Sequence, residues 1–242
     1  MNKDLIRQRF AKNLENYDKN AKIQKHMAKK LVSLIKNKTP NKILEIGCGT
    51  GFVTKLISKE FTFKTYLALD IVEDCRQYIY NINPNVKFSS IDIEDFIKKD
   101  TDKYDLIISN ASLQWVDDFE GVTKNLQTKL APNGELVFST FGNENFREIF
   151  HIVGASLNYY SNYELKNLFP NSEIYPEIHI MAFDTPKDVL KHLQSTGVNA
   201  LEKKSWTKKD LINFENGYNN ICSRRPTLTY NPVYIKILSP VG

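Results

Sequence analysis

KILEIGCGTGF, residues 42–52, is an apolar run followed by glycines at every second position, Gly47, Gly49 and Gly51. Glycine is used where the backbone takes a positive φ or comes close to a ligand. Residues 43–46 have the β-branched content of a buried strand, and residues 52–61 carry apolar side chains at helical spacing. The stretch therefore predicts a strand, a tight bare turn and a helix.

The residues around this turn distinguish between kinds of nucleotide-binding loop. A phosphate-binding P-loop needs Lys and Ser or Thr after its last glycine, but Phe52 and Val53 follow here. The dinucleotide fingerprint is G-x-G-x-x-G, whereas this loop reads G-x-G-x-G. Glu45, two residues before Gly47, would repel a pyrophosphate and suits a ligand with an ammonium or sulfonium group. S-adenosylmethionine carries both groups.

The chain from residue 42 alternates predicted strands with predicted helices. The expected strands are 42–46, 65–70, 86–89, 104–109 and 135–140, and the expected helices between them include 52–61, 73–81 and 119–130. Such alternation predicts βαβ units, with a parallel sheet covered by helices on both faces. Two further helices are expected before the first strand, within residues 3–37.

The regular alternation of predicted strands and helices ends after Phe141. Residues 143–169 look helical, 177–183 form a predicted strand, helices follow at 186–195 and 207–220, and a last strand spans 228–238. We expect one domain over 1–242, with N-terminal helices (1–37), a cofactor-binding core (40–141), a lid (142–227) and the last strand (228–238).

Polar residues follow the predicted strands, where open α/β sheets bind their ligands. Asp70 lies about 20 residues past the glycine loop, as expected for an acid that binds ribose hydroxyls, with Ile71 beside it; a helix N-cap is its alternative role. Asp92 could accept a hydrogen bond from the adenine amino group while Ile93 packs on the ring, or could cap the next helix. Asn110 could face the methionine part.

Composition constrains the class of protein without selecting a partner. The 33 basic and 28 acidic residues give a net charge of +5 and a pI near 8.9, and no RNA-binding signature accompanies them, so we expect no nucleic-acid partner. No apolar run approaches the roughly 20 residues that span a bilayer, and the N-terminus does not resemble a secretory signal, so a cytoplasmic protein without membrane contact is expected.

Cysteine and histidine usage argues against disulfides and metals. The 3 cysteines are scattered and odd in number, which argues against a disulfide framework and for a reducing compartment. The 4 histidines form no pair at metal-ligand spacing in the sequence. We therefore expect no metal site.

The motifs ILEIGCGTG, ALD, SIDIED and SNASLQW together resemble those of class I S-adenosylmethionine-dependent methyltransferases over residues 40–141. The resemblance implies a Rossmann-like α/β fold whose seven-stranded sheet is mostly parallel, with a last strand that is antiparallel. It also suggests that the final hairpin is formed by the strands near 180 and 230. The pattern after Phe141 adds the expectation of a helical lid inserted in the C-terminal half.

A narrower resemblance covers nearly the whole chain. FSTFG (138–142), LQSTGVNAL (193–201) and RPTLTYNPVY (225–234), with Phe10 and Tyr17 near the N-terminus, are similar to malonyl-acyl-carrier-protein O-methyltransferases of biotin synthesis. These enzymes esterify the free carboxyl of a malonyl thioester at an early step towards pimelate. The implied partner is malonyl-acyl carrier protein, which is acidic, or malonyl-coenzyme A.

The implied reaction needs no catalytic general base, because a malonyl carboxyl is already ionised near neutral pH. The buried carboxylate needs a cation, and the planar fork of arginine suits it. Arg225 is the first candidate, followed by Arg147 and Arg224, while Tyr17 and Trp115 are candidate substrate contacts. Two alternatives stay open: a methyltransferase for another small acid of the aconitate type, and a non-catalytic partner module that binds the cofactor.

Overall fold

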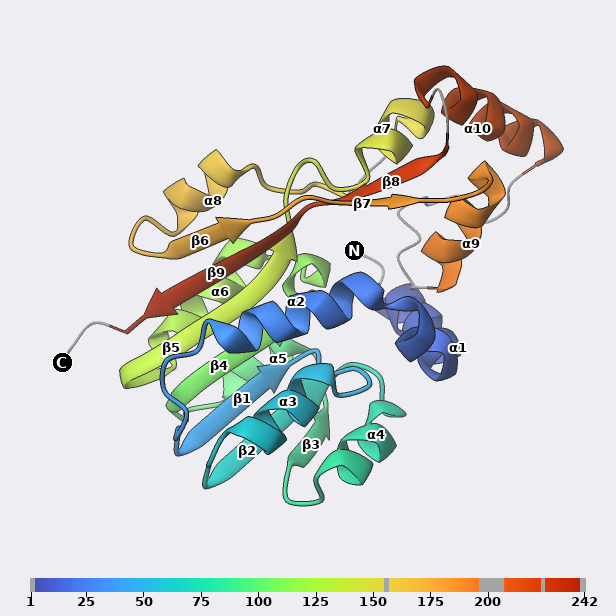
Figure 1. Ribbon diagram of the computed structural model, residues 1–242. Helices are drawn as coiled ribbons and strands as arrows, with labels where there is room; N and C mark the ends of the chain where they lie inside the picture. Colours follow the sequence, from blue (N-terminus) through green and yellow to red (C-terminus); the bar gives the residue numbers. More distant parts are fainter. Residues whose placement is uncertain (1–2, 155–156, 196–206, 223–224, 240–242) are drawn as a thin grey trace.

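A seven-stranded sheet forms the centre of the molecule (Figure 1), as seen in a computed structural model that describes residues 3–154, 157–195, 207–222 and 225–239. Its order is β3-β2-β1-β4-β5-β9-β6, and of these seven strands only β9 runs in the opposite direction to the others. The strands are β1 (Lys42–Ile46), β2 (Thr65–Asp70), β3 (Lys87–Ser90), β4 (Tyr104–Asn110), β5 (Leu130–Phe141), β6 (Glu173–Pro176) and β9 (Pro232–Leu238). The predicted Rossmann-like, mostly parallel sheet is confirmed.

Helices cover both faces of this sheet, because its central strands are apolar on both sides. In β1, Ile43 belongs to a core with α2 (Lys22–Ser33), α3 (Phe52–Glu60) and α4 (Cys75–Ile82). Its neighbour Leu44 points to the opposite core, which includes residues of α5 (Ile93–Lys99) and α6 (Phe119–Thr128). Figure 1 shows α2, α3 and α4 in front of the sheet and α5 and α6 behind it.

The C-terminal half extends the molecule beyond the sheet. Strands β7 (His179–Ala182) and β8 (Thr227–Tyr230) pair in a separate two-stranded antiparallel sheet. Around it lie α7 (Arg147–Val153), α9 (Pro186–Ser195) and α10 (Lys208–Ile221), while α8 (Asn162–Leu168) precedes β6 (Figure 1). The predicted helical stretch 143–169 is thus two short helices.

The final hairpin matches the expected one only in part. The strands near 180 and 230 do pair, as β7 and β8, but outside the seven-stranded sheet. In that sheet the partner of β9 at the edge is β6, which was not predicted from the sequence. The predicted strand 228–238 is likewise divided at Asn231. The side chain of Asn231 donates to the carbonyl of Glu177 (2.8 Å) and its backbone N–H donates to Asn145 Oδ1 (3.1 Å). These bonds replace regular ladder bonds, so the hairpin leaves the main sheet at this point.

Candidate functional site

The glycine turn after β1 has the backbone that its sequence predicts. Gly47, Gly49 and Gly51 have φ values of 68°, 51° and 84°. At Gly47 a side chain has no room, because a Cβ there would lie 2.0 Å from Oγ of Ser112 in the turn after β4. At Gly49 a Cβ would meet nothing within 4 Å, because this glycine faces a pocket above the sheet. The turn therefore combines a close contact between two loops with a bare ligand-facing surface.

Asp70, at the end of β2, is bound to this turn. Its Oδ2 accepts a hydrogen bond from the backbone N–H of Gly49 (2.8 Å), and its Oδ1 accepts one from Val72 (2.9 Å). It does not cap α4, whose N-cap residue is Asp74. Burial raises the pKa of the Asp70 carboxyl, although its backbone hydrogen bonds oppose this shift. Asp70 and Ile71 both line the pocket.

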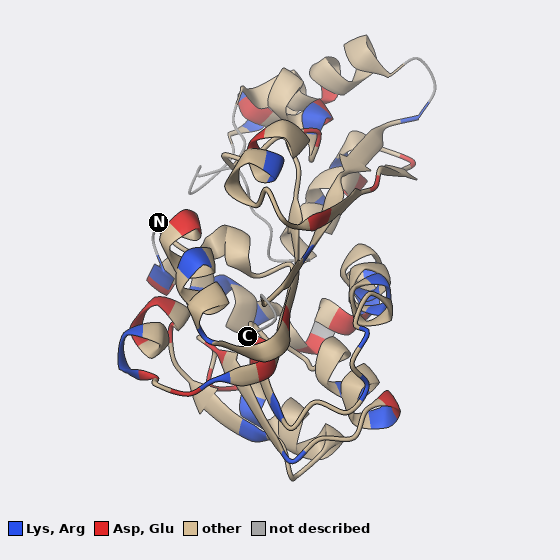
Figure 2. Cartoon of the chain, turned by 90° about the vertical axis from the view of Figure 1, so that its left-hand side faces the viewer, with Lys and Arg blue, Asp and Glu red and all other residues tan. Residues whose placement is uncertain are grey.

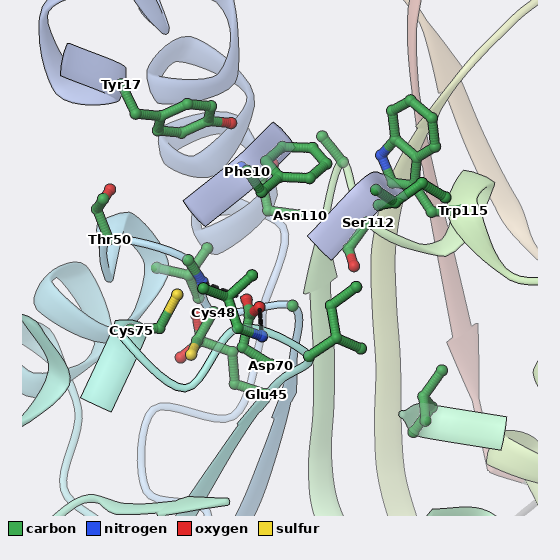
Figure 3. Close-up of a pocket in the computed structure, with 18 of the residues that line it drawn as sticks. Phe10, Tyr17, Glu45, Cys48, Thr50, Asp70, Cys75, Asn110, Ser112 and Trp115 are labelled. Carbon is green, nitrogen blue, oxygen red and sulfur yellow. Dashed lines mark hydrogen bonds between the residues drawn. The ribbon is translucent and has the colours of Figure 1, made fainter. Parts of the chain in front are cut away.

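Glu45 lies beneath the turn and is 2% exposed. Its Oε2 accepts hydrogen bonds from Thr54 Oγ1 (2.6 Å) and from the hydroxyl of Tyr66. Desolvation raises the pKa of Glu45 to about 7, while the two hydroxyl donors favour the charged form. Figure 3 shows Glu45, Cys48 and Asp70 together at the floor of the pocket.

Asp92 takes the capping role that was one of its two predicted roles. Its Oδ1 accepts from the N–H of Glu94 at the start of α5 (2.8 Å), and its Oδ2 lies 2.7 Å from Nζ of Lys3. Lys3 also forms an ion pair with Glu94. The Asp92 carboxylate and Ile93 still line the pocket, so an adenine contact would have to share Asp92 with Lys3.

Asn110, at the end of β4, holds neighbouring elements together with its amide. Its Nδ2 donates to the carbonyl of Gln24 (3.1 Å), and its Oδ1 accepts from Ser139 Oγ (2.9 Å). The next residue, Ala111, has a φ of 50°, a strained value for a residue with a side chain. This strain turns the chain from β4 into the 3-10 helix η1 (Leu113–Trp115) beside the pocket.

The roof of the pocket is α1 (Lys3–Asn20). One face of this helix supplies its lining residues at helical spacing: Lys3, Ile6, Phe10, Leu14 and Tyr17. Arg7 Nε donates to the carbonyl of Ile71 (3.0 Å), and Thr50 Oγ1 donates to Asp18 Oδ1 (2.6 Å). Both ends of α1 are therefore fixed to the loops below, and this role of the N-terminal helix was not predicted from the sequence.

Aromatic contacts join this roof to the walls. The ring of Phe10 lies 5.8 Å from that of Trp115 and 6.5 Å from that of Tyr17, and Tyr17 stacks on Phe52 at 6.0 Å. Figure 3 shows Phe10 and Tyr17 entering the pocket from above, with Ser112 and Trp115 on one side. The structure thus brings Tyr17 and Trp115, both predicted from sequence, into one pocket.

The candidate arginines lie elsewhere. Arg147 begins α7 and lies 3.4 Å from Glu144, while Arg225 lies 3.4 Å from Asp184. Both side chains are exposed, and neither lines the pocket. Arg224 and residues 196–201 of the LQSTGVNAL segment lie outside the described residues.

A second hollow adjoins the pocket, and Val116 lines both. It lies between η1, the end of β5 and residues 157–160, and is lined by Gln114, Val116, Asp117, Phe119, Thr140, Phe141, Leu157, Asn158, Tyr159 and Tyr160. Desolvation raises the pKa of both Tyr159 and Tyr160, so their hydroxyls stay protonated at neutral pH. The hollow therefore offers uncharged hydrogen-bond donors.

The charges of the first pocket fit a cationic nucleoside. Its acidic lining residues are Glu45, Asp70 and Asp92, and its basic lining residue, Lys3, is paired with Asp92 and Glu94. Apolar side chains such as Ile71 and Ile93 can cover a base. A bare glycine surface, acids and flat apolar walls match the sulfonium, ribose and adenine of S-adenosylmethionine.

Known proteins resemble this chain along most of its length. A profile of the methyltransferase domain matches residues 17–197. A malonyl-[acyl-carrier protein] O-methyltransferase of Calditerrivibrio nitroreducens is 38% identical over 226 residues, which cover 90% of this chain and 89% of the relative. The protein of the same name from Haemophilus influenzae is 33% identical, over 97% of this chain and 94% of the relative.

The chain belongs to the malonyl-[acyl-carrier protein] O-methyltransferase family. This methyltransferase uses S-adenosylmethionine as its cofactor.

Solved structures agree with the fold. The N-methyltransferase NodS from Bradyrhizobium japonicum, in complex with S-adenosyl-L-homocysteine, superposes with a TM-score of 0.59 at 14% identity, over 97% of this chain and 98% of NodS. YcgJ from Bacillus subtilis gives a TM-score of 0.59 at 11% identity, over 90% of this chain and 99% of that protein. Among the described residues of this methyltransferase, no helix is both long and apolar enough to cross a bilayer.

Proposed function

We propose that this methyltransferase converts the free carboxyl of a malonyl thioester, carried by acyl carrier protein, into its methyl ester at an early step of biotin synthesis. The observation that supports this substrate is the similarity to relatives of that name over nearly the full length of both chains. When bound, S-adenosylmethionine supplies the electrophilic methyl group.

The proposed cofactor site is the pocket beneath α1. In this proposal, the glycine turn and Glu45 lie near the methionine part, and Asp70 and Ile71 bind the ribose. Asp92 and Ile93 bind the adenine, and Asn110 faces the methionine amino acid. The support is that all of these positions except Gly51 line one continuous pocket at the carboxyl ends of the strands.

The proposed acyl site is the second hollow, which meets the cofactor pocket at Val116. The malonyl carboxylate needs no base, since it is already ionised, but it needs donors that replace water. Asn158, Tyr159 and Tyr160 provide neutral donors there. Trp115, Phe10 and Tyr17 form the apolar boundary that keeps water away from the reacting oxygen.

The acyl carrier is proposed to dock through charge. Figure 2 shows Lys and Arg distributed over the helices and loops with Asp and Glu between them, and the chain has a net charge of +5. Within α2, Lys22 and Lys29 are exposed and Lys25 and Lys30 half-buried, which makes its outer face basic. An acidic carrier would associate faster with such a face, in a salt-dependent way.

A methyl-transfer assay tests the proposed function. Purified protein would receive labelled S-adenosylmethionine with malonyl-acyl carrier protein, malonyl-coenzyme A or free aconitate, and mass spectrometry would identify the methyl ester. We expect ester on the malonyl thioesters and none on aconitate. Formation of ester on aconitate alone would show that the substrate is a small acid of that type and not a malonyl thioester. Cofactor binding without formation of any ester would favour a non-catalytic module.

Arg225 remains the proposed anchor for the substrate carboxylate, although it is exposed and paired with Asp184. It would reach the carboxylate only if residues 142–227 close over the site as a lid. We expect Arg225→Ala to raise the KM for the malonyl thioester and leave the Kd for the cofactor unchanged, with Arg147→Ala as the comparison. If the KM of Arg225→Ala equals that of the unmodified protein, Arg225 is not the anchor.

A further inference from the structure

Two histidines that are far apart in the sequence meet on one carboxylate at the base of the β7–β8 extension. His26 Nε2 of α2 lies 2.9 Å from Oε2 of Glu177, and His179 Nε2 of β7 lies 3.0 Å from the same oxygen. The two imidazole rings are 4.6 Å apart between their centroids. We call His26, Glu177 and His179 the hinge cluster, because it lies where the hairpin leaves the main sheet.

The hinge cluster is held in place by the fold around it. The backbone N–H of Glu177 donates to the carbonyl of Pro232 (2.8 Å), and its carbonyl accepts from the side chain of Asn231 (2.8 Å). The hydroxyl of Tyr234, a fully buried residue of β9, donates to Oε2 of Glu177 (3.0 Å). These contacts fix the Glu177 carboxyl between the two imidazoles.

We propose that the hinge cluster is a binding site for a divalent transition metal, with Zn²⁺ as the reference ion. Two imidazoles and one carboxylate are a ligand set that zinc and its neighbours prefer, whereas Mg²⁺ and Ca²⁺ prefer oxygen ligands alone. One ligand atom from each residue lies within 4.8 Å of the other two.

A bound ion would require small shifts of the Glu177 oxygen and a closer approach of the two imidazole ligand atoms, which lie within 4.8 Å of each other. Ligand atoms at 2.0–2.1 Å from a tetrahedral ion are about 3.3 Å apart. The two observed N···O distances of 2.9 and 3.0 Å would therefore open by a few tenths of an ångström. The ion would replace the two N···O hydrogen bonds with three metal bonds, one to each imidazole and one to the carboxylate, and any proton on a ligating nitrogen would be released. Tyr234 would hold the carboxylate as an outer partner. The side chain of His26 is 46% exposed, which leaves an entry path and a position for water.

The position of the hinge cluster suggests what the metal does. It would join α2, which follows the roof helix α1, to the hairpin that leads to β7 and β8 (Figure 1). Since the cluster lies outside the cofactor pocket and the second hollow, the metal would fix the relative position of these elements without entering the chemistry. This inference is independent of the proposed substrate.

Zinc titration of untagged, chelator-treated protein tests the site. We expect saturable binding of one Zn²⁺ by calorimetry, weakened at least about tenfold by His26→Gln and by His179→Gln, which keep a hydrogen-bonding side chain. His151→Gln is the matched control, because His151 is exposed on α7 with its Nδ1 2.7 Å from the carbonyl of Arg147. At 100 times the Kd, Zn²⁺ should raise the Tm by roughly 5–10 °C.

Two further readouts distinguish this site from adventitious binding to cysteine. Co²⁺ should give visible d–d absorption that His26→Gln and His179→Gln abolish, and Zn²⁺ should slow amide hydrogen exchange in α2 and β7 more than in α3 or α4. The proposal is overturned if no saturable binding occurs, or if both histidine variants bind Zn²⁺ as tightly as the His151→Gln control.

Discussion

Neutralising Glu45 should change how the stability of this methyltransferase depends on pH. Glu45 is 2% exposed, and desolvation raises its pKa from 4.5 to about 7. A carboxyl whose pKa is raised by folding stabilises the native state fully below its unfolded pKa, and this contribution is lost as pH rises through the folded pKa. At 1.36 kcal/mol per pH unit, the loss between pH 4.5 and 7 is about 3 kcal/mol.

Urea unfolding of cofactor-free protein from pH 4.5 to 8 measures this loss. Glu45→Gln keeps a side chain of the same shape but cannot ionise, so its free energy of unfolding should rise relative to that of the unmodified protein by about 3 kcal/mol across this range. Titrating groups that do not interact with Glu45 cancel in the difference between the two proteins. A difference that stays constant with pH would refute the argument that burial holds Glu45 close to neutrality.

Tyr66→Phe provides an internal check, since the Tyr66 hydroxyl donates to the charged carboxylate. Removal of this hydroxyl should raise the pKa of Glu45 in the folded protein, so the pH range over which stability is lost should move to higher pH. The cationic cofactor should act in the opposite direction, because a positive charge favours ionised Glu45. We therefore expect the affinity for S-adenosylmethionine to increase with pH up to about 7 in the unmodified protein and to lose this dependence in Glu45→Gln.

Three further variants test the loops and the second hollow. Gly47→Ala should destabilise the protein more than Gly49→Ala in urea unfolding: both carry a left-handed strain of about 1–2 kcal/mol, but only the first meets Ser112 at 2.0 Å; equal losses would contradict this. Lys3→Met removes the ion pairs that hold the start of α1, so S-adenosylhomocysteine should dissociate several-fold faster in stopped flow, with little change in stability. Tyr160→Phe should raise the KM for the malonyl thioester and spare the cofactor Kd; an unchanged KM would remove Tyr160 from the acyl site.

The sequence by itself determined the central fold and the location of the cofactor loop. Both depend on local patterns: continuous apolar runs specify strands buried on two faces, and glycines in alternation specify a turn that other residues cannot form without strain. The strands 42–46 and 65–70 were therefore predicted with the bounds that the structure gives. For these two strands and the glycine turn, the types and spacing of neighbouring residues were sufficient for the prediction.

Tertiary structure alone decided which distant residues meet. Contacts between elements far apart in sequence place α1 over the pocket and divide the last strand at Asn231. Such a contact also forms the ion pair between Lys3 and Asp92. His26 and His179 show this most clearly, because no sequence spacing relates them, yet both lie within 3.0 Å of one Glu177 oxygen. Helix α2 packs on the main sheet at β4 and β5, and this placement, a property of the assembled fold, brings His26 to Glu177 and His179.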